Sequence, residues 1–471
     1  MTDIQTNIVK KTVYDGNLYI LDKTPYVIED DLSEINKVYV PQDSYDGYLL
    51  LNPSREISSK MKPYNYSAIS TGNVPFYDNI AVIMTSETNA PMMAAMYSKG
   101  LAANEDYMTL SEAKAVTKDT LGNFRYNEDI TSFREFKYFT NVTELPTNFM
   151  FDVPNLEYID IPESVTKLNH TTFGISSSKH NLGWESKLKY VTGLKNVEYV
   201  GRNSFQFCYD LISLDFSQKL TSIDVPFNCL RSLETLGDVS NVDTYIPSTA
   251  KMRLLYDAET IQTLYMPKFN IIGDYSFYQA YNLTNLTLDW GNVTSIADFA
   301  FANTDQNPPY QTSNKIEFIP DLPNLETIGT GAFQQCKYLK YVGDMPKITD
   351  IPKYCFNMNI NLRKIGDISN VESIGNYGFS CCFLLEKLDL PKCSVVGKEA
   401  FSLENPETFQ INPDKYSVHR TINFGLPYES ITWGNDVLSE YDGVAMTKVF
   451  CNGEELTEEQ YEALGGHKPT W

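Results

Sequence analysis

The stretch LETIGTGAFQQCKYLKYVG, which begins at Leu325, decides the fold because the chain repeats it. The next stretch, ITDIPKYCFNMNINLRKIG from Ile348, and the one after it, VESIGNYGFSCCFLLEKLDLP from Val371, align with it around one Phe. This marker Phe recurs at residues 149, 173, 205, 227, 277, 301, 333, 356, 379 and 401. Most of these positions are 22 to 24 residues apart, so the sequence predicts a repeat architecture.

The longer gaps between marker residues also follow the repeat. Two gaps of 32 residues contain polar inserts, SSSKHNLGWES after Ile175 and NTDQNPPYQTSNK after Ala302, which we interpret as loops. The gap of 50 residues holds two coils, and in the weaker one Ala250 or a neighbour stands where Phe is expected. The frame of that coil is kept by Val242, Ile261, Leu264 and Met266. The sequence therefore predicts ten or eleven coils of about 23 residues.

Each unit carries apolar residues at the spacing L-x-x-L-x-L, as at Leu211, Leu214 and Phe216. The alternation at the end of this segment predicts a short strand with one buried side. A second apolar segment, such as residues 371–374, then leads into the marker Phe. One coil cannot bury its own apolar stripe, so neighbouring coils must stack. The expected fold class is an α+β repeat solenoid with a continuous core and a parallel β-sheet face.

These residues resemble the BspA-like leucine-rich repeats, whose pattern runs I-G-x-x-A-F-x-x-C-x-x-L-x-x-I-x-I-P. The resemblance covers roughly residues 130 to 411. Repeats of this class occur mainly on bacterial cell-surface proteins, so the resemblance implies a leucine-rich-repeat solenoid with a non-enzymatic adhesion or protein-binding role. It also implies an exported protein, and here the chain departs from the pattern. Its apolar runs are short, as at residues 80–84, whereas a signal peptide needs an apolar region of about 7 to 15 residues.

Composition excludes two classes of partner. The 38 Lys and Arg against 60 Asp and Glu give a formal net charge of −22, so no phosphate-neutralising face is expected and nucleic acid is excluded. A membrane-spanning helix needs about 20 mostly apolar residues, whereas the apolar runs of this chain are short, as at residues 80–84. No membrane insertion is therefore expected. The 32 Tyr and 25 Phe supply enough apolar surface to order most of the chain.

Four parts are expected along the chain. Residues 1–90 form a small β-rich N-terminal domain for attachment or assembly, with strands at 18–21, 25–28, 38–40, 48–51 and 80–84. Residues 91–130 form a helical entry cap that begins with a helix at 91–101. Residues 131–411 form the solenoid. Residues 412–471 form a C-terminal cap with a hairpin around Asn452-Gly453 and a helix at 457–464.

The loop that leads to Glu112 invites comparison with a calcium loop. If Glu112 were the twelfth residue of such a loop, Leu101 and Ala103 would take the first and third positions, and Asp106 the sixth, where Gly is needed. Aliphatic side chains cannot coordinate calcium. We therefore expect Thr109 and Glu112 to form a T-x-x-E capping box that opens a short helix.

No other metal or cofactor site is expected. Three of the eight Cys, at 208, 336 and 382, stand three residues after a marker Phe, which favours buried free thiols. Cys336 and Cys382 are two coils, or about 10 Å, apart, beyond the roughly 7 Å limit for a disulfide. The chain has no C-x-x-C pair, and its four His, at 170, 180, 419 and 467, are scattered through loops and termini.

No catalytic residue is assigned. The sequence contains no G-x-S-x-G or H-E-x-x-H motif. Carboxylates such as Asp160 and Asp215 could meet across neighbouring strands, but a solvated sheet face explains them more simply than acid and base catalysis. We therefore expect an interaction module whose sheet surface displays the candidate ligand-binding residues Glu157, Tyr158, Asp160, Asp215, Tyr265, Thr287, Tyr341 and Asp389.

The leading hypothesis for the setting is a bacteriophage virion, because release by lysis would bring such a protein to its partner without an export signal. The chain would then be a fibre, decoration or receptor-binding component. The partner would be another protein subunit, including a second copy of the chain or a phage head or tail component, or a host surface molecule. The alternatives are a bacterial cell-surface or secreted adhesin for host protein or glycan, and a glycan-active enzyme.

Overall fold

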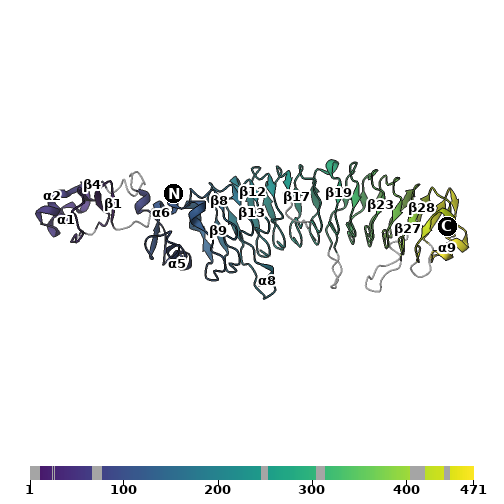
Figure 1. The fold of residues 1–471 in the computed structure, drawn as a ribbon, viewed down its shortest axis with the longest axis horizontal. Helices are drawn as coiled ribbons and strands as arrows, with labels where there is room; N and C mark the ends of the chain where they lie inside the picture. Colours follow the sequence, from purple (N-terminus) through teal and green to yellow (C-terminus); the bar gives the residue numbers. More distant parts are fainter. Residues whose placement is uncertain are drawn as a thin grey trace.

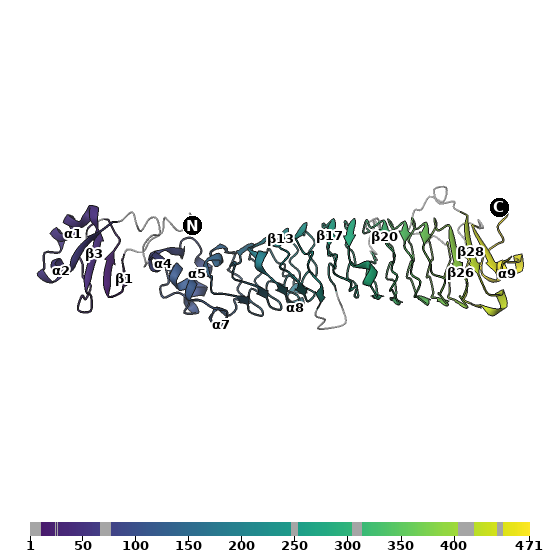
Figure 2. The same ribbon diagram turned by 90° about the horizontal axis from the view of Figure 1, so that it is seen from above.

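The computed structural model describes residues 11–23, 25, 27–65, 77–245, 253–303, 313–403, 419–439 and 446–471. The main body is a long solenoid in which successive coils lie side by side like rungs (Figure 1). A small module lies beyond its entry end, and the C-terminus lies at the far end, as the view from above also shows (Figure 2). The solenoid predicted from the repeat is thus confirmed.

The N-terminal module is a four-stranded sheet with helices packed on one side. Its strands lie in the order β1 (Lys11–Tyr14), β2 (Asn17–Ile20), β3 (Lys37–Pro41) and β4 (Met61–Tyr64). The short helix η1 (Gln42–Ser44) and the helices α1 (Tyr45–Leu51) and α2 (Arg55–Lys60) connect β3 to β4. The core contains Leu18, Ile20, Val38, Val40, Tyr48 and Met61 and is separate from the core of the solenoid.

Two of the strand predictions for this module are wrong. Residues 48–51 belong to helix α1, which buries Tyr48 against the sheet and leaves Leu50 80% exposed. This apolar run forms a helix of which Tyr48 is the buried residue. Over so few residues, the spacing of apolar side chains alone does not distinguish a helix from a strand. The predicted strand at 25–28 is also absent from its described residues, 25, 27 and 28, while Thr24 and Tyr26 lie outside the described ranges.

The entry cap begins earlier than predicted. Strand β5 (Val82–Thr85) pairs antiparallel with β6 (Tyr107–Thr109), and Met84 joins the core that continues into the solenoid. Residues 80–84 therefore belong to the cap rather than to the first module. The cap's other elements are α4 (Tyr77–Ile80), α5 (Ala90–Ser98), α6 (Leu110–Ala115), α7 (Lys118–Leu121) and η2 (Arg134–Tyr138). Helix α5 confirms the helix expected from residue 91. No helix within the described ranges is long and apolar enough to cross a membrane.

Each coil of the solenoid contributes strands to two faces. The long-strand face comprises β7 (Ser132–Phe133), β9 (Tyr158–Asp160), β11 (Tyr190–Thr192), β13 (Ser213–Phe216), β15 (Thr235–Gly237), β17 (Thr263–Tyr265), β18 (Asn285–Thr287), β20 (Phe318–Ile319), β22 (Tyr341–Val342), β24 (Lys364–Ile365), β26 (Lys387–Leu390), β28 (Arg420–Phe424) and β30 (Thr447–Cys451). The short-strand face comprises β8 (Glu144–Leu145), β10 (Lys167–Leu168), β12 (Tyr199–Val200), β14 (Ser222–Ile223), β16 (Thr244–Tyr245), β19 (Ser295–Ile296), β21 (Thr327–Ile328), β23 (Asp350–Ile351), β25 (Ser373–Ile374), β27 (Val395–Val396) and β29 (Thr432–Trp433).

Within each face, strands of most neighbouring coils pair in parallel, for example Tyr158 with Tyr190 and Lys167 with Tyr199. The ladders are interrupted at a few steps, such as between β15 and β17. Short helices interrupt the connections at α8 (Ser177–His180), η3 (Leu194–Asn196), η4 (Trp290–Asn292) and η6 (Tyr428–Ser430). Helix α8 lies in the first polar insert, which confirms that this insert leaves the coil. Most of the second insert, residues 304–312, lies outside the described ranges.

The marker Phe residues form a stack through the core. The rings of Phe333 and Phe356 are 5.3 Å apart with an interplanar angle of 2°, and the pairs Phe301–Phe333 and Phe379–Phe401 are stacked in the same way. All of these rings are buried. A spacing close to the separation of hydrogen-bonded strands lets one ring per coil fill the core without a gap.

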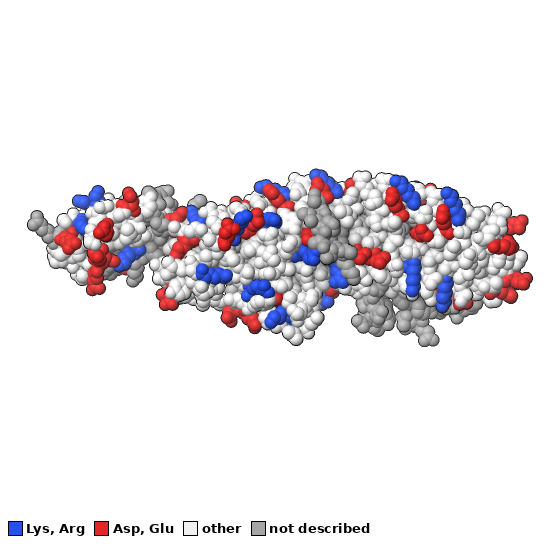
Figure 3. All heavy atoms as spheres, viewed as in Figure 1, with Lys and Arg blue, Asp and Glu red and all other residues white. Residues whose placement is uncertain are grey.

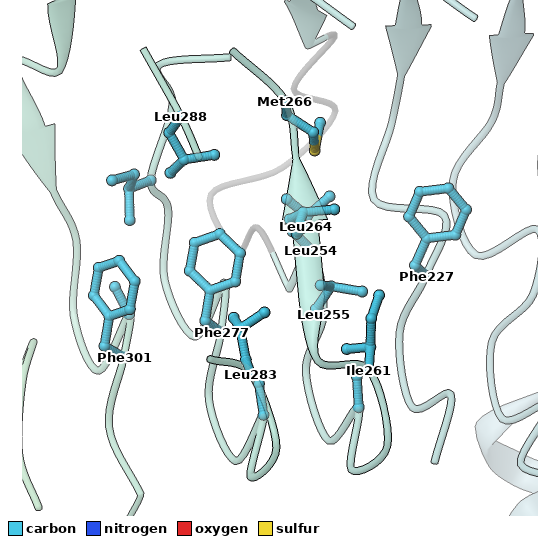
Figure 4. Close-up of a cluster of buried hydrophobic side chains, with 14 of the residues drawn as sticks. Phe227, Leu254, Leu255, Ile261, Leu264, Met266, Phe277, Leu283, Leu288 and Phe301 are labelled. Carbon is cyan, nitrogen blue, oxygen red and sulfur yellow. The ribbon is translucent and has the colours of Figure 1, made fainter. Parts of the chain in front are cut away.

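The weak coil uses Leu255 in place of Phe. The Leu255 N–H donates to Ser276 O, the carbonyl just before Phe277, as the Phe277 N–H does to Ala300 O just before Phe301. Figure 4 shows Leu255 between Phe227 and Phe277. The predicted substitute, Ala250, lies outside the described residues. A Leu fills less volume than a Phe, and a narrow apolar gap lies beside it, lined by Ile223, Phe227, Leu236, Val239, Val242, Leu254, Leu264 and Met266.

Asparagine side chains join one coil to the next. The Nδ2 atoms of Asn155, Asn282 and Asn361 donate to backbone carbonyls of the preceding coil at 2.8, 2.6 and 2.6 Å. Similar bonds are made by Asn141, Asn196, Asn241, Asn324 and Asn370. Carbonyls in the turns, which have no strand partner, are satisfied by these amides. The sequence reasoning missed this role, although the Asn precedes Leu or Val in every case.

The solenoid extends beyond the predicted boundary at residue 411. Strands β28 and β30 continue the parallel ladder from β26, and β29 continues the one from β27. The predicted hairpin around Asn452-Gly453 is confirmed, because β31 (Glu454–Glu455) pairs antiparallel with β30. Helix α9 (Glu458–Ala463) follows with a Thr457–Gln460 capping box and closes the end.

Replacing Phe333 or Phe356 by Ala should lower the free energy of unfolding by about 3 to 5 kcal/mol, because each change leaves a cavity inside the stack. Phe318→Ala is the matched control, since this ring is 55% exposed and its loss should cost far less. Thermal and urea unfolding of the three variants provide the measurement. A core variant that melts within a degree of the wild-type protein would contradict the stacked arrangement.

Candidate binding face

The long-strand face positions all eight candidate ligand-binding residues. Side chains alternate along each strand, so the residues on either side of a buried position point outward, as Tyr158 and Asp160 do around Ile159. The strands carry Tyr158 and Asp160 on β9, Asp215 on β13, Tyr265 on β17, Thr287 on β18, Tyr341 on β22 and Asp389 on β26, and Glu157 directly precedes β9. The face was therefore correctly placed by its alternation.

These eight residues do not form one compact site. At about 4.8 Å per strand, the distance from β9 to β26 is about 40 Å. Only Glu157, Tyr158 and Asp160 share a strand or its edge, while Tyr265 and Thr287 occupy adjacent positions on β17 and β18. The face is an extended surface with several separate groups of side chains.

The carboxylates on this face are engaged in structural contacts. Asp160 Oδ1 accepts a hydrogen bond from Thr192 Oγ1 at 2.7 Å, and Asp215 accepts from the backbone N–H groups of Gly193 and Leu194 at 3.2 and 2.9 Å. Strand β11 separates Asp160 from Asp215, so these residues lie about 10 Å apart rather than on neighbouring strands. The two carboxylates therefore do not meet across neighbouring strands.

Asp389 is held by two partners. Its carboxylate accepts from Asn423 Nδ2 at 2.7 Å and contacts Lys387 Nζ at 2.9 Å. Burial raises the pKa of this carboxyl group, but the bonds from Asn423 and Lys387 outweigh it, and the net pKa is lowered. Asp389 is therefore a fixed negative charge at neutral pH.

Exposed and half-buried aromatic rings gather in two clusters on this face. The entry cluster consists of Tyr158 and Tyr190, whose rings stack at 5.4 Å, with the Arg134 guanidinium 4.5 Å from the Tyr158 ring. The distal cluster consists of Phe318 and Tyr341, which stack at 5.0 Å, with Lys364 Nζ 5.8 Å from the Tyr341 ring.

The sequence analysis missed four members of these clusters, Arg134, Tyr190, Phe318 and Lys364. The signal that finds the aromatic ones is the repeat register, because Tyr158, Tyr190, Phe318 and Tyr341 all directly precede the first buried residue of their strand. Tyr265 stands two positions later in that register and is 55% exposed. Rings at one register position in neighbouring coils stack, so the alignment itself predicts the clusters.

Charged side chains surround the clusters in opposite-sign pairs. Lys189 contacts Glu157 at 3.3 Å beside the entry cluster, and Lys340 contacts Glu317 at 2.7 Å beside the distal cluster. Figure 3 shows acidic and basic side chains scattered along the rod, with uncharged surface between them. Exposed pairs of this kind contribute little stability but set the charge pattern that a partner meets.

The thiols belong to the core. All eight Cys are buried and free. The Sγ atoms of Cys336 and Cys382 donate to Phe301 O and Phe356 O, the marker carbonyls of the preceding coils, at 3.2 and 3.1 Å. Burial raises the pKa of Cys208, Cys336 and Cys382 to about 12. A protonated thiol that bonds a carbonyl explains the Cys in this position of the repeat.

The loop before α6 is a helix cap. Glu112 Oε2 accepts from the Thr109 N–H at 2.7 Å, Thr109 Oγ1 accepts from the Glu112 N–H at 3.3 Å, and Glu112 Oε1 accepts from the Ala103 N–H at 2.7 Å. The predicted capping box is confirmed. Both oxygens of the carboxylate that a calcium loop would use are thus bonded to the protein's own donors.

Among the described residues, one group has side chains close enough to share a metal ion. Ligand atoms of Glu458, Glu462 and His467 lie within 4.8 Å of one another on the exposed end of the chain. The sequence analysis placed His467 among scattered histidines and did not foresee this approach. Exposed acidic groups commonly lie this close without an ion, so the group supports no assignment.

The repeat of this chain matches a known family. A model of the BspA type leucine rich repeat region matches residues 119–179, 243–319 and 310–423 in six copies. The chain belongs to this family. No curated protein matches it. The predicted resemblance is confirmed over about half of the chain, and repeats of this kind generally mediate protein binding.

Several solved structures are similar to it. A leucine-rich cell surface protein from Faecalibacterium prausnitzii is 16% identical, with a TM-score of 0.33, and the match covers 70% of this chain and 87% of that one. A leucine-rich repeat protein from Bacteroides ovatus is 17% identical, with a TM-score of 0.31 and coverage of 66% and 87%. The pneumococcal vaccine antigen PcpA is 16% identical, with a TM-score of 0.31 and coverage of 67% and 72%. Likenesses at this level bear on no function.

The native protein should resist thiol reagents at pH 8, and denaturation without reductant should expose eight reactive thiols. Because the folded state keeps protons that unfolded thiols, with a pKa of 9.0, release, stability should fall as the pH rises from about 9 toward 12. Titration with a chromogenic disulfide and urea unfolding across this pH range provide the measurements. A count well below eight in denaturant would reveal disulfides and refute the assignment.

Proposed function

We propose that the chain is a non-enzymatic protein-interaction scaffold whose long-strand face binds a protein partner. The observation that carries the proposal is the gathering of exposed aromatic rings, with cations beside them, on that one face. Tyr265 and Phe318 are each 55% exposed, and Tyr190 is 38% exposed. Aromatic residues and Arg are the side chains most enriched where protein interfaces gain their binding energy.

The arrangement suits a partner that contacts several coils. The entry cluster lies on the paired strands β9 and β11, Tyr265 on the pair β17 and β18, and the distal cluster on the pair β20 and β22. All three strand pairs pack on the same core, so these rings lose little conformational freedom on binding. The charged pairs Lys189–Glu157 and Lys340–Glu317 form a polar rim beside them. In this proposal Tyr158, Tyr265 and Tyr341 are anchors, while Glu157, Asp160, Asp215, Thr287 and Asp389 shape the surface around them.

Replacing Tyr158, Tyr265 and Tyr341 together by Ser should weaken partner binding at least a hundredfold and change stability little, since all three rings lie on the surface. A photo-crosslinking residue at position 265 identifies the partner, and biolayer interferometry then measures its affinity for each variant. Tyr338→Ser is the matched control, because this ring is 40% exposed and lies in the turn before β22 rather than on a strand of the face. Equal affinities of the triple variant and the wild-type protein would refute the proposal.

We propose further that the N-terminal module attaches the solenoid to a larger assembly. The support is its separate hydrophobic core, which lets it fold as its own unit. A bacteriophage virion is the first candidate assembly, with the chain as a fibre, decoration or receptor-binding component. A bacterial cell surface, with the chain as an adhesin, is the second.

Deletion of residues 1–65 should abolish attachment and leave the solenoid folded, because the cap that closes it begins at α4 and β5. Mass spectrometry of purified particles and of envelope fractions, from cells that produce the full or the shortened chain, provides the measurement. Absence of the full chain from particles, with recovery in the envelope, would exclude the virion in favour of the adhesin. Incorporation of the shortened chain would remove the attachment role from the module.

A further inference from the structure

The strand ladder of the long-strand face is interrupted between β15 and β17, between β18 and β20, and between β24 and β26. The last of these interruptions opens the surface. From β22 to β24, the backbone N–H groups of Arg363 and Gly366 donate to Lys340 O and Val342 O at 2.9 and 2.8 Å. Between residues 363–369 and 386–390, all of which the structure describes, the Glu386 N–H to Arg363 O bond at 3.1 Å is the single backbone hydrogen bond. The two strands are therefore joined at one end and diverge beyond it.

A change of coil type causes this divergence. In three successive coils the chain turns at Asp321, Asp344 and Asp367, and each of the first two carboxylates accepts the backbone N–H of the next Asp, at 3.0 and 2.7 Å. The close approach requires glycine, since a Cβ on Gly366 would lie 2.6 Å from Asp344 N. In the next coil Asp389 and Leu390 replace this Gly-Asp pair. Leu390 is buried, so β26 runs straight on where β24 turns away.

The divergence opens a groove with a volume of about 450 Å³. This size lies within the range of small-ligand sites. Eight of the twelve lining residues are charged or polar, and the lining comprises Asp344, Arg363, Lys364, Ile365, Gly366, Asp367, Ile368, Ser369, Glu386, Lys387, Leu388 and Asp389. A polar groove on an exposed face recognises its occupant through charge and hydrogen bonds.

The charges of the groove are separated along its length. Arg363, Lys364 and Lys387 lie where the strands begin, together with one acid, Glu386, whereas Asp344, Asp367 and Asp389 lie toward the strand ends. Some of these charges form ion pairs and are partly neutralised: Arg363 contacts Glu386 at 3.9 Å, and Lys387 contacts Asp389 at 2.9 Å. Lys364, Asp344 and Asp367 are exposed and belong to neither pair. The groove thus has a positive end and a negative end.

We propose that this groove binds an extended peptide segment that carries one acidic and one basic side chain on the same side. The acidic group would lie among Arg363, Lys364 and Lys387, and the basic group beside Asp344 and Asp367. This inference rests on the proposed protein-binding function and names its partner more closely. The distal cluster continues the same strand register into the groove, since Phe318, Tyr341 and Lys364 are aligned on β20, β22 and β24.

The strand geometry sets the spacing of the two charges. Lys364 and Asp367 are three residues apart, which limits the distance between their Cα atoms to about 10 Å. In an extended peptide, side chains two or four residues apart point to the same side, about 7 and 13 Å from each other, whereas odd separations put them on opposite sides. A separation of two or four residues therefore matches the groove.

An array of fluorescent Thr-based peptides, each with one Asp and one Lys separated by one to five positions, tests this inference with the full-length protein. Fluorescence anisotropy should show tightest binding at separations of two and four. All-acidic peptides and oligogalacturonate are included as probes that would use only the positive end. Equal affinity at every separation, or for the all-acidic probes, would overturn the inference, and so would the absence of measurable peptide binding.

Two double variants, each of which removes the charge at one end of the groove, locate the binding site. Asp344→Asn with Asp367→Asn keeps the Oδ1 acceptors of the turns and removes their charge, and Lys364→Gln with Lys387→Gln removes the positive end. Each double variant should lower the affinity of the best peptide at least tenfold. The matched controls Asp321→Asn and Lys448→Gln, which lie outside the groove on the same face, should change it less than twofold. Equal losses in the controls would assign the effect to overall charge and overturn the site.

These outcomes are distinguishable from failure of the proposed function. The groove variants retain Tyr158, Tyr265 and Tyr341, and the triple Ser variant retains every charge of the groove. Loss of partner binding in the triple Ser variant, together with unchanged peptide binding in the groove variants, would refute the groove alone.

Discussion

The structure depends on the stacking of one coil on the next at the separation of hydrogen-bonded strands. Because the step is about 4.8 Å, flat rings at the same position of successive coils stack, and the rings of Phe333 and Phe356 are separated by 5.3 Å. Leu255 takes this position in the weak coil. Strand pairing, the Asn155 type of amide bond and the thiol of Cys336 all act across the same step. Each coil therefore holds its neighbours, and no coil has a core of its own.

This dependence explains why the sequence predicted the solenoid and missed its ends. A core built from one residue per coil leaves a periodic mark, so the Phe positions reveal the fold. Residues 48–51 carry no such mark, and their apolar run fits a helix as well as a strand. The ladder beyond residue 411 was missed because β28 and β30 keep their buried alternation but are not followed by a marker Phe. Leu255 was missed because hydrogen-bond register, which sequence does not display, assigns its place.

The candidate face was predicted and its organisation was not, for a related reason. Alternation along one strand tells which side chains point outward, so all eight residues lie on the long-strand face. Their grouping is found only when neighbouring coils are compared, because Tyr190 stacks on Tyr158 of the preceding coil and Tyr341 stacks on Phe318. Asp160 and Asp215 fail as a pair because one further coil, with its own strand, lies between them.

Recognition by a solenoid must come from departures from its repeat. A perfectly regular stack presents the same surface at every step, and a partner could then bind in many registers with equal energy. The interruptions of the strand ladder break that equivalence, and at the step from Gly366-Asp367 to Asp389-Leu390 the interruption also separates positive from negative charge. The aromatic clusters break it again, since only some coils carry a ring before the buried strand residue. The regular core supplies rigidity, and these few irregular coils give the surface a unique register.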